Sequence, residues 1–248
     1  MPMISPFEHS DLLPTGKLRV GIMYTNPVVA AKDPGTGVLS GIAVDLAREL
    51  ARRVSAPIEL VAYETTSGML GDLRSGAWDI AFTAVAPDHA GEISFTAPYI
   101  ETEGTYLVPA ASPLRTISDV DCEGVNIAVS ARSSLDLHLS RHLQRARLVR
   151  IPGADAAFDL LRSGKASVLA GVRQRLAAVA PTLPGSRVMD GRFMVIAQGV
   201  AIAKERAAGA KYLRAFVEDA KASGLVLRIV KKNGIGGASV APPSASLQ

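Results

Sequence analysis

The hydrophobic positions of the first half of this chain change their spacing several times, and each change predicts an element. Residues 17–23 alternate and then run apolar, as a strand entering a core does. Residues 44–54 carry apolar side chains at helical spacing. Apolar and β-branched runs predict further strands over 58–63 and 78–85, with a short helix over 67–75 between them. This alternation predicts an α/β fold with mostly parallel strands.

The second half repeats the plan. A strand over 104–110 is followed by a change of course at Pro113. Strands are then expected over 125–130, 148–151, 166–170 and 193–203, and helices from Ser133 and Ser134 onward and over 155–162, 172–179, 207–223 and 225–232. The last residues, 236–248, are rich in Ser, Pro and Ala and are expected to form a frayed terminus.

The composition is that of a globular protein with a sizeable core. The chain has 248 residues, of which 48% are hydrophobic and 20% charged. The longest apolar stretch, 193–203, is interrupted by Gln198 and is too short to span a bilayer. We therefore expect no stable membrane insertion, and we expect a monomer.

The formal net charge is +4, but the basic residues do not form a nucleic-acid surface. They are scattered along the chain, and aromatic residues, which would stack on bases, make up only 5%. No nucleic-acid partner is expected. Cys122 is the single cysteine, so the chain has no internal disulfide.

Three motifs occur in order within residues 41–99: G-I-A-V-D-L-A-R-E-L-A, L-R-S-G-A-W-D-I-A and I-S-F-T-A-P-Y. Near the other end, residues 212–234 read Y-L-R-A-F-V-E-D-A-K-A-S-G-L-V-L-R-I-V-K-K-N-G. Together these segments resemble the bacterial extracellular solute-binding proteins of family 3, which serve polar amino acid ABC transporters. The resemblance covers nearly the whole chain.

That resemblance implies a two-lobed, type 2 periplasmic-binding-protein-like fold. Each lobe would be a mostly parallel sheet flanked by helices, with two crossover strands as the hinge. We expect lobe one to comprise residues 1–108 plus 199–248, and lobe two residues 109–198. The lobes would capture a small polar or anionic organic molecule between them and close by hinge motion. An ABC permease is the expected partner.

The family resemblance also implies a periplasmic location. Residues 1–10 show neither a basic region nor an apolar region of a secretory signal. If Met1 is the native start, a cytoplasmic orphan binding protein or sensor is the expected alternative.

Two positions depart from what the resemblance implies for amino acid binders. Such proteins carry a threonine and an arginine shortly before the F-S-x-P-Y motif, and the guanidinium clamps the ligand carboxylate. Here the equivalent count reaches Ala86 and His89, and no arginine lies between Arg74 and Arg115. The acidic residue that would bind the ligand ammonium is replaced by Gly171. The nearby Arg173 would favour an anion, so an amino-acid-like or carboxylate ligand is expected.

Candidate ligand-binding residues lie after strands, because ligands of open α/β folds gather at the carboxyl ends of strands. An aromatic or hydroxyl side chain there can instead belong to the packing, Ser133 or Ser134 can simply cap a helix, and Arg132 and His89 can face solvent. The turn before the helix at Ser133 is also suited to an anion. The candidates are Tyr24, Asn26, Thr65, Thr83, Ala84, Val85, His89, Arg132, Ser133, Ser134, Gly171, Arg173 and Gln198.

No catalytic, metal-binding or cofactor-binding motif is expected. The chain has no nucleophile elbow, Walker loop or G-x-G-x-x-G. His138 and His142 stand four apart on an expected helix, where a solvated face is favoured over a metal site. The alternative function is an enzyme on the same fold, such as a cyclohexadienyl dehydratase, for which Glu103 is the one candidate general acid.

Overall fold

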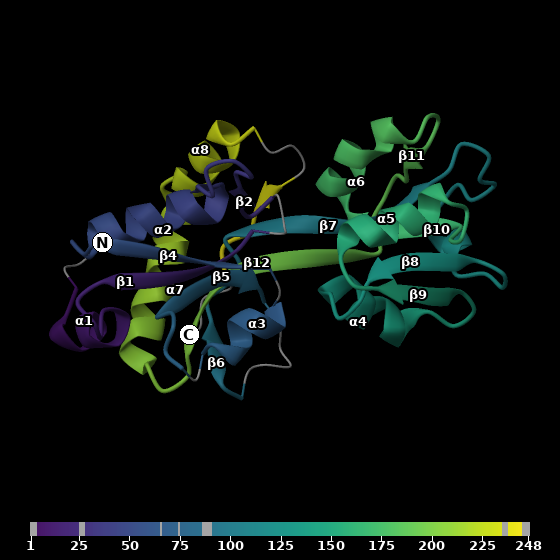
Figure 1. Ribbon diagram of the computed structural model, residues 1–248. Helices are drawn as coiled ribbons and strands as arrows, with labels where there is room; N and C mark the ends of the chain where they lie inside the picture. Colours follow the sequence, from purple (N-terminus) through teal and green to yellow (C-terminus); the bar gives the residue numbers. More distant parts are fainter. Residues whose placement is uncertain are drawn as a thin grey trace. The chain divides into compact units, whose positions relative to one another are not determined.

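We describe the protein from a computed structural model, in which residues 4–24, 28–64, 66–73, 75–85, 91–234 and 238–244 are described. The chain divides into two compact units (Figure 1). Unit 1 comprises residues 1–101 and 197–248, and unit 2 comprises residues 102–196. Each unit is an α/β assembly with its own core. None of the helices among the described residues combines the length and apolar character needed to cross a bilayer.

Unit 1 is built on three parallel strands whose carboxyl ends meet at one edge. The strand order is β4-β1-β5-β12, and β12 runs antiparallel to β5. Met23 pairs with Tyr63 and Ile22 with Phe82, so β1, β4 and β5 end at about the same level. Their bounds are β1 Leu18–Met23, β4 Ile58–Tyr63, β5 Ile80–Ala84 and β12 Met194–Ala203.

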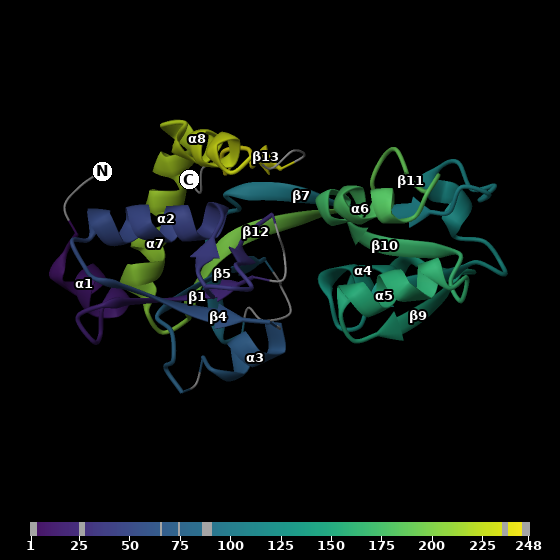
Figure 2. The same cartoon turned by 45° about the horizontal axis from the view of Figure 1, so that its top comes forward.

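The helices of unit 1 lie around this sheet (Figures 1 and 2). The buried residues of α2 are spaced as a helical stripe, which is the pattern that predicted this helix. Lys232 of α8 lies 3.0 Å from the Asp45 carboxylate of α2 and links the two helices. The bounds are α1 Pro6–Leu12, α2 Ile42–Arg53, α3 Thr66–Gly71, α7 Ala207–Ala222 and α8 Leu225–Lys232.

Unit 2 repeats the arrangement with the strand order β7-β10-β8-β9. Strands β8, β9 and β10 are parallel, and β7 runs antiparallel to β10. Leu107, Leu161 and Leu176 are part of its buried core. The bounds are β7 Ile100–Val108, β8 Asn126–Ser130, β9 Arg147–Ile151, β10 Val168–Val172, α4 Ser134–His142, α5 Ala154–Arg162 and α6 Arg173–Val179.

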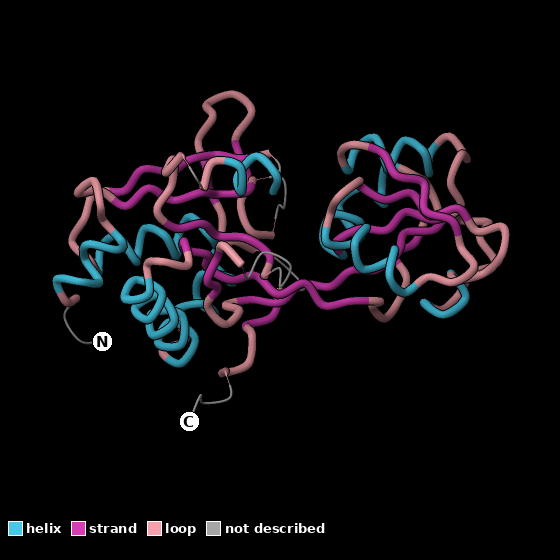
Figure 3. Tube along the Cα trace, turned by 90° about the horizontal axis from the view of Figure 1, so that it is seen from below, coloured by secondary structure: helices cyan, strands magenta, loops and turns pink. Residues whose placement is uncertain are grey.

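Two strands carry the chain from one unit to the other. Figure 3 shows β7 and β12 as the extended segments that make these passages. The lobe boundaries expected from the sequence, at 108/109 and 198/199, fall at the end of β7 and within β12. That division into lobes stays a prediction.

Several short elements join these sheets. The turn-rich segment before α2 contains a small hairpin, in which Ala31 pairs with Ser40. The remaining elements are β2 Ala31–Lys32, β3 Leu39–Ser40, β6 Ile93–Phe95, β11 Arg187–Val188, β13 Ser239–Val240 and the 3₁₀ turns Ile117–Val120 and Ala180–Thr182.

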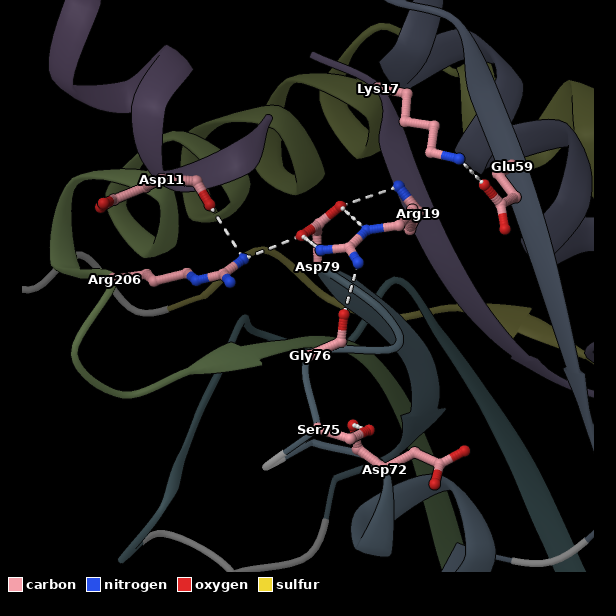
Figure 4. A network of polar contacts seen from close by, with 9 residues as sticks. All are labelled: Asp11, Lys17, Arg19, Glu59, Asp72, Ser75, Gly76, Asp79 and Arg206. Carbon is pink, nitrogen blue, oxygen red and sulfur yellow. Dashed lines mark hydrogen bonds and ion pairs between the residues drawn. The ribbon is translucent and has the colours of Figure 1, made fainter. Parts of the chain in front are cut away.

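At the amino edge of the unit 1 sheet, a buried carboxylate organises a polar network (Figure 4). Asp79 accepts hydrogen bonds from Arg19 and Arg206, and Arg206 also donates to the Asp11 backbone carbonyl. The Asp11 carboxylate accepts from the Gly209 amide in the first turn of α7. The network thus connects α1, β1 and α7 at the edge away from the strand carboxyl ends.

One expectation from the sequence was wrong, and one helix was not expected. Residues 239–244 are not a frayed end: Ser239 pairs with Glu101 on β7, and the Lys221 ammonium donates to the Pro242 carbonyl. Helix α1, which begins at a capping box formed by Ser5 and Glu8, has no counterpart among the elements expected from the sequence.

Candidate functional site

The carboxyl edge of the unit 1 sheet brings four of the candidate residues together. Antiparallel pairing sets Thr83 opposite Gly199 and Ala84 opposite Gln198, and the Val85 amide donates to the Ala197 carbonyl. Thr83 is 3% exposed, and no described residue gives its hydroxyl a hydrogen-bond partner. A buried polar group without a partner costs free energy, and a hydrogen bond to a bound molecule or water would remove that cost.

Tyr24 follows β1 at the same edge. Its hydroxyl donates to the Glu64 carboxylate at 2.6 Å, and this hydrogen bond raises the Tyr24 pKa. The Lys32 ammonium lies 5.2 Å from the centre of the ring. The ring therefore lies between an acidic and a basic side chain, beside the strand ends.

In unit 2 the turn between β8 and α4 is tightly organised. Ser133 is the N-cap of α4, and its hydroxyl accepts from the Asp136 amide. Arg132 adopts a left-handed backbone conformation, with φ 60°, which a non-glycine residue seldom does. Its amide donates to the Asp136 carboxylate at 2.8 Å. The expected cap at Ser133 is confirmed, and the strained turn leaves the Arg132 side chain exposed.

Gly171 lies near the end of β10, where a side chain would meet the core. A Cβ atom built there would lie 2.5 Å from Cδ2 of Leu176. The place where relatives are expected to carry an acidic side chain is thus occupied from within by a leucine of α6. An aspartate at this position would require Leu176 to move.

Arg173 follows directly and is held by three acceptors of unit 2. Its Nε donates to Glu103 at 2.7 Å, and its Nη atoms donate to the Met189 and Gly191 carbonyls. Arg192 also donates to Glu103, at 2.8 Å. Arg173 was expected to favour an anion. In this structure its anionic partner is the Glu103 carboxylate of the same chain.

The structure brings the candidates together in two groups, one at the strand ends of each unit. Unit 1 contributes Tyr24, Thr83, Ala84, Val85 and Gln198, and unit 2 contributes Arg132, Ser133, Ser134, Gly171 and Arg173. Asn26, Thr65 and His89 lie outside the described residues.

Two residues that contact these strand ends, Glu64 and Arg192, were not among the candidates expected from the sequence. Glu64 directly follows β4, and this position after a strand was a signal that could have singled it out. Arg192 follows a turn and lies just before β12, and no local pattern marked it.

At the edge of unit 2, Glu103 is held between two arginines. The hydrogen bonds from Arg192 and Arg173 lower the Glu103 pKa, so this carboxyl is held ionised. Within the described ranges, no three His, Cys, Asp or Glu side chains form a group that could hold a metal ion. His138 and His142 stack with ring centres 4.0 Å apart, and His142 Nδ1 is hydrogen-bonded to the His138 carbonyl.

Comparisons with known proteins identify the family of this chain. The sequence model of the bacterial extracellular solute-binding proteins, family 3, matches residues 18–235. The glutamine-binding protein of Geobacillus stearothermophilus is 23% identical over 194 residues, which cover 77% of this chain and 74% of the relative.

Solved structures show the same two-lobed, type 2 periplasmic-binding fold. An ABC transporter binding component of Wolinella succinogenes, complexed with lysine, matches with a TM-score of 0.78 at 21% identity, covering 88% of this chain and 95% of its own. An ancestral amino-acid-binding protein described as a precursor of cyclohexadienyl dehydratase matches with a TM-score of 0.76 at 22% identity, covering 90% and 97%. With its motifs, its sheet topology and a family match over most of its length, this chain belongs to the bacterial extracellular solute-binding proteins, family 3.

Proposed function

We propose that this protein captures a small polar organic solute, amino-acid-like or a carboxylate, and delivers it to an ABC-type permease. The observation that carries this proposal is the buried Thr83 hydroxyl, which has no partner among the described residues. A ligand group that accepts or donates one hydrogen bond there removes the cost of that unpaired group. Family membership supports the assignment to uptake and to a periplasmic or extracellular location.

The ligand class follows from what the chain lacks and what it carries. No arginine or lysine lies between residues 75 and 114, so residues 75–101 of unit 1 offer no guanidinium that can clamp a carboxylate through paired charge-assisted bonds. In unit 2 the acidic place at Gly171 is filled by Leu176. A relative named for glutamine binding and a solved structure complexed with lysine support an amino-acid-like solute. We propose a derivative or a carboxylate in preference to a standard α-amino acid.

The first test is mass spectrometry of the purified protein, native and then denatured. A stoichiometric small molecule released on denaturation gives the ligand's mass, and calorimetry with that compound gives its affinity. Tight binding of common L-amino acids, at micromolar strength, would contradict the preference for a derivative. If neither co-purified solute nor binding to a panel of amino acids and carboxylates is found, the proposed function is wrong.

The Thr83→Val variant links binding to the observed geometry. It keeps the side-chain shape and removes the unpaired hydroxyl, so we expect about tenfold weaker binding, which equals about 1.4 kcal/mol, with stability unchanged or raised. The matched control is Thr105→Val. The Thr105 hydroxyl is buried and donates to the Met189 and Gly191 carbonyls, so its loss should lower stability.

The enzyme alternative needs a general acid, and the geometry does not favour Glu103 in that role. A general acid must be protonated at the working pH, whereas Arg192 and Arg173 lower the pKa of this carboxyl. We propose that the protein is not a dehydratase, and turnover of prephenate or arogenate would overturn this. The reason for this assay is the similarity in fold to the ancestral amino-acid-binding protein described as a precursor of cyclohexadienyl dehydratase.

A further inference from the structure

Glu103 stands at the same sheet edge as the candidate residues of unit 2. Because β7 runs antiparallel to β10, its first residues lie beside the carboxyl end of β10, and Gly104 pairs with Val172. A Cβ built on Gly104 would lie 2.8 Å from Leu135 of α4, so the turn before α4 is a close neighbour. Glu103 is the residue before this glycine, and Arg173 the residue after Val172. The carboxylate is thus positioned where a solute bound at the strand ends would meet it.

Two guanidinium groups already neutralise this carboxylate. Arg173 Nε donates to Glu103 Oε2 at 2.7 Å, and Arg192 Nη1 donates to Oε1 at 2.8 Å. With one negative and two positive charges, the cluster has a net charge of +1 from these three side chains. A cationic ligand group would therefore find the Glu103 carboxylate already paired with two arginines, and the three side chains together carry one excess positive charge.

The two arginines that contact Glu103 differ in exposure and in the number of their other hydrogen bonds. The Arg173 side chain is 26% exposed and also donates to the Met189 and Gly191 carbonyls, which accept from the Thr105 hydroxyl as well. Arg192 is 54% exposed and makes a single hydrogen bond to Glu103. Planar guanidinium groups lose little freedom when several acceptors fix them. Arg173 is therefore the anchored partner, and Arg192 the one that solvent or ligand can displace.

We propose that Arg173 is a specificity-determining residue that acts as a built-in competitor: by occupying Glu103, it closes this carboxylate to cationic ligand groups and selects for neutral or anionic solutes. An intramolecular group is present at a high effective concentration, so a free cation must displace it at an entropic disadvantage. Exclusion by an occupied or like-charged site is a general way to gain specificity. This inference rests on the proposed binding function and adds to it the charge of the solute.

The test measures selectivity between matched cationic and neutral compounds, because a general folding defect weakens both members of a pair alike. The probes are L-arginine against L-citrulline, and 4-guanidinobutanoate against 4-ureidobutanoate, titrated by calorimetry into the full chain. We expect Arg173→Gln to shift the ratio of cationic to neutral affinity by at least about tenfold towards the cation, which equals about 1.4 kcal/mol. Arg173→Gln combined with Arg192→Gln should shift it further.

Two controls identify Glu103 as the cause. Arg173→Lys keeps a positive charge beside Glu103, so it should still exclude cations. Glu103→Gln combined with Arg173→Gln removes the carboxylate and should abolish the gain. An unchanged ratio in Arg173→Gln overturns the inference, as does a gain that survives Glu103→Gln, or no binding of any probe to any variant. If the wild-type protein captures a solute while Arg173→Gln shows no gain, this inference alone fails; if wild type and variants bind no solute at all, the proposed function fails too.

Discussion

The Asp79 carboxylate holds Arg19 by three hydrogen bonds, from the backbone amide at 3.0 Å, from Nε at 3.0 Å and from Nη2 at 2.7 Å. The Asp79 side chain is fully buried, and the Arg206 guanidinium lies 3.2 Å from the same carboxylate. One buried negative charge thus compensates two largely covered positive charges. Such an arrangement makes the carboxylate harder to replace than either of its partners.

We therefore expect Asp79→Asn to lower the free energy of unfolding by about 3 kcal/mol or more, because breaking a buried pair leaves uncompensated charge. Denaturant unfolding measures the change. The matched control is Asp159→Asn, which removes an ion pair to Arg162 whose side chains are both about 60% exposed. This control should change stability by less than about 0.5 kcal/mol. Equal losses in the free energy of unfolding for the two variants would show that the buried network stabilises the fold no more than an exposed ion pair does.

Stability at acidic pH should depend on Glu49. Hydrogen bonds from Arg52 and then Arg53 lower the Glu49 pKa from 4.5 to about 2. Because the folded pKa is depressed, the stabilisation is full above about pH 4.5 and is lost as the pH falls towards 2. Glu49→Gln should show a flatter decline over this window in denaturant titrations at several pH values. Arg52→Ala, which removes the largest cause, should lie between the variant and wild type.

Local patterns in the sequence are sufficient to predict most elements of this fold. The strand predicted over 58–63 and the helix predicted over 225–232 have the bounds of β4 and α8. The signal for α1 was also present, since Ser5 and Glu8 have the spacing of a capping box. It was missed because α1 is short and buries one residue of its own, Leu12. Short helices carry too few apolar positions to show a period.

The pairing of Glu103 with Arg173 could not be predicted in the same way. The two residues are 70 positions apart, and only the antiparallel register of β7 and β10 sets them side by side. The sequence showed two charged residues near a strand end, without indicating that they neutralise one another. The net charge at this edge depends on which residues the strand register sets side by side. That register is specified by the whole sheet and not by a local pattern.

The cap at Ser133 separates a structural role from a ligand contact. Ser133→Ala should lower stability by about 0.5–2 kcal/mol, because the Asp136 amide loses its acceptor. Ser133→Asp keeps an acceptor at the cap and should recover most of that loss. If the turn binds an anionic ligand, the added carboxylate weakens binding even though the fold is intact. Unfolding and ligand titration on the same two variants measure both effects; unweakened binding by Ser133→Asp would place the ligand's anionic group elsewhere.

The segment 238–244 should contribute to the stability of unit 1. It adds β13 to the edge of β7, buries Ala241 and gives the largely buried Lys221 ammonium an acceptor at Pro242. A chain that ends at Gly237 should lose about 1–3 kcal/mol, because a hydrogen bond to a charged group is broken in a covered place. Ser244→Ala, which removes an exposed contact to Glu218, is the control and should have little effect. Truncation without loss of stability would contradict this account.

Gly171 and Leu176 should prove energetically coupled. Gly171→Ala introduces a Cβ that would lie 2.5 Å from Leu176 Cδ2, and we expect a loss of about 1–3 kcal/mol from overpacking. Leu176→Ala alone should cost about 2–5 kcal/mol through the cavity it leaves. In the double variant the smaller side chain removes the clash, so the two losses should sum to more than the measured total.

Gly71→Ala is the control, since among the described residues no atom beyond its chain neighbours and its own helix backbone lies within 4 Å of a Cβ at that position. Strict additivity in a double-mutant cycle would show that the backbone relaxes around a side chain at 171, and an acidic residue would then be tolerated there.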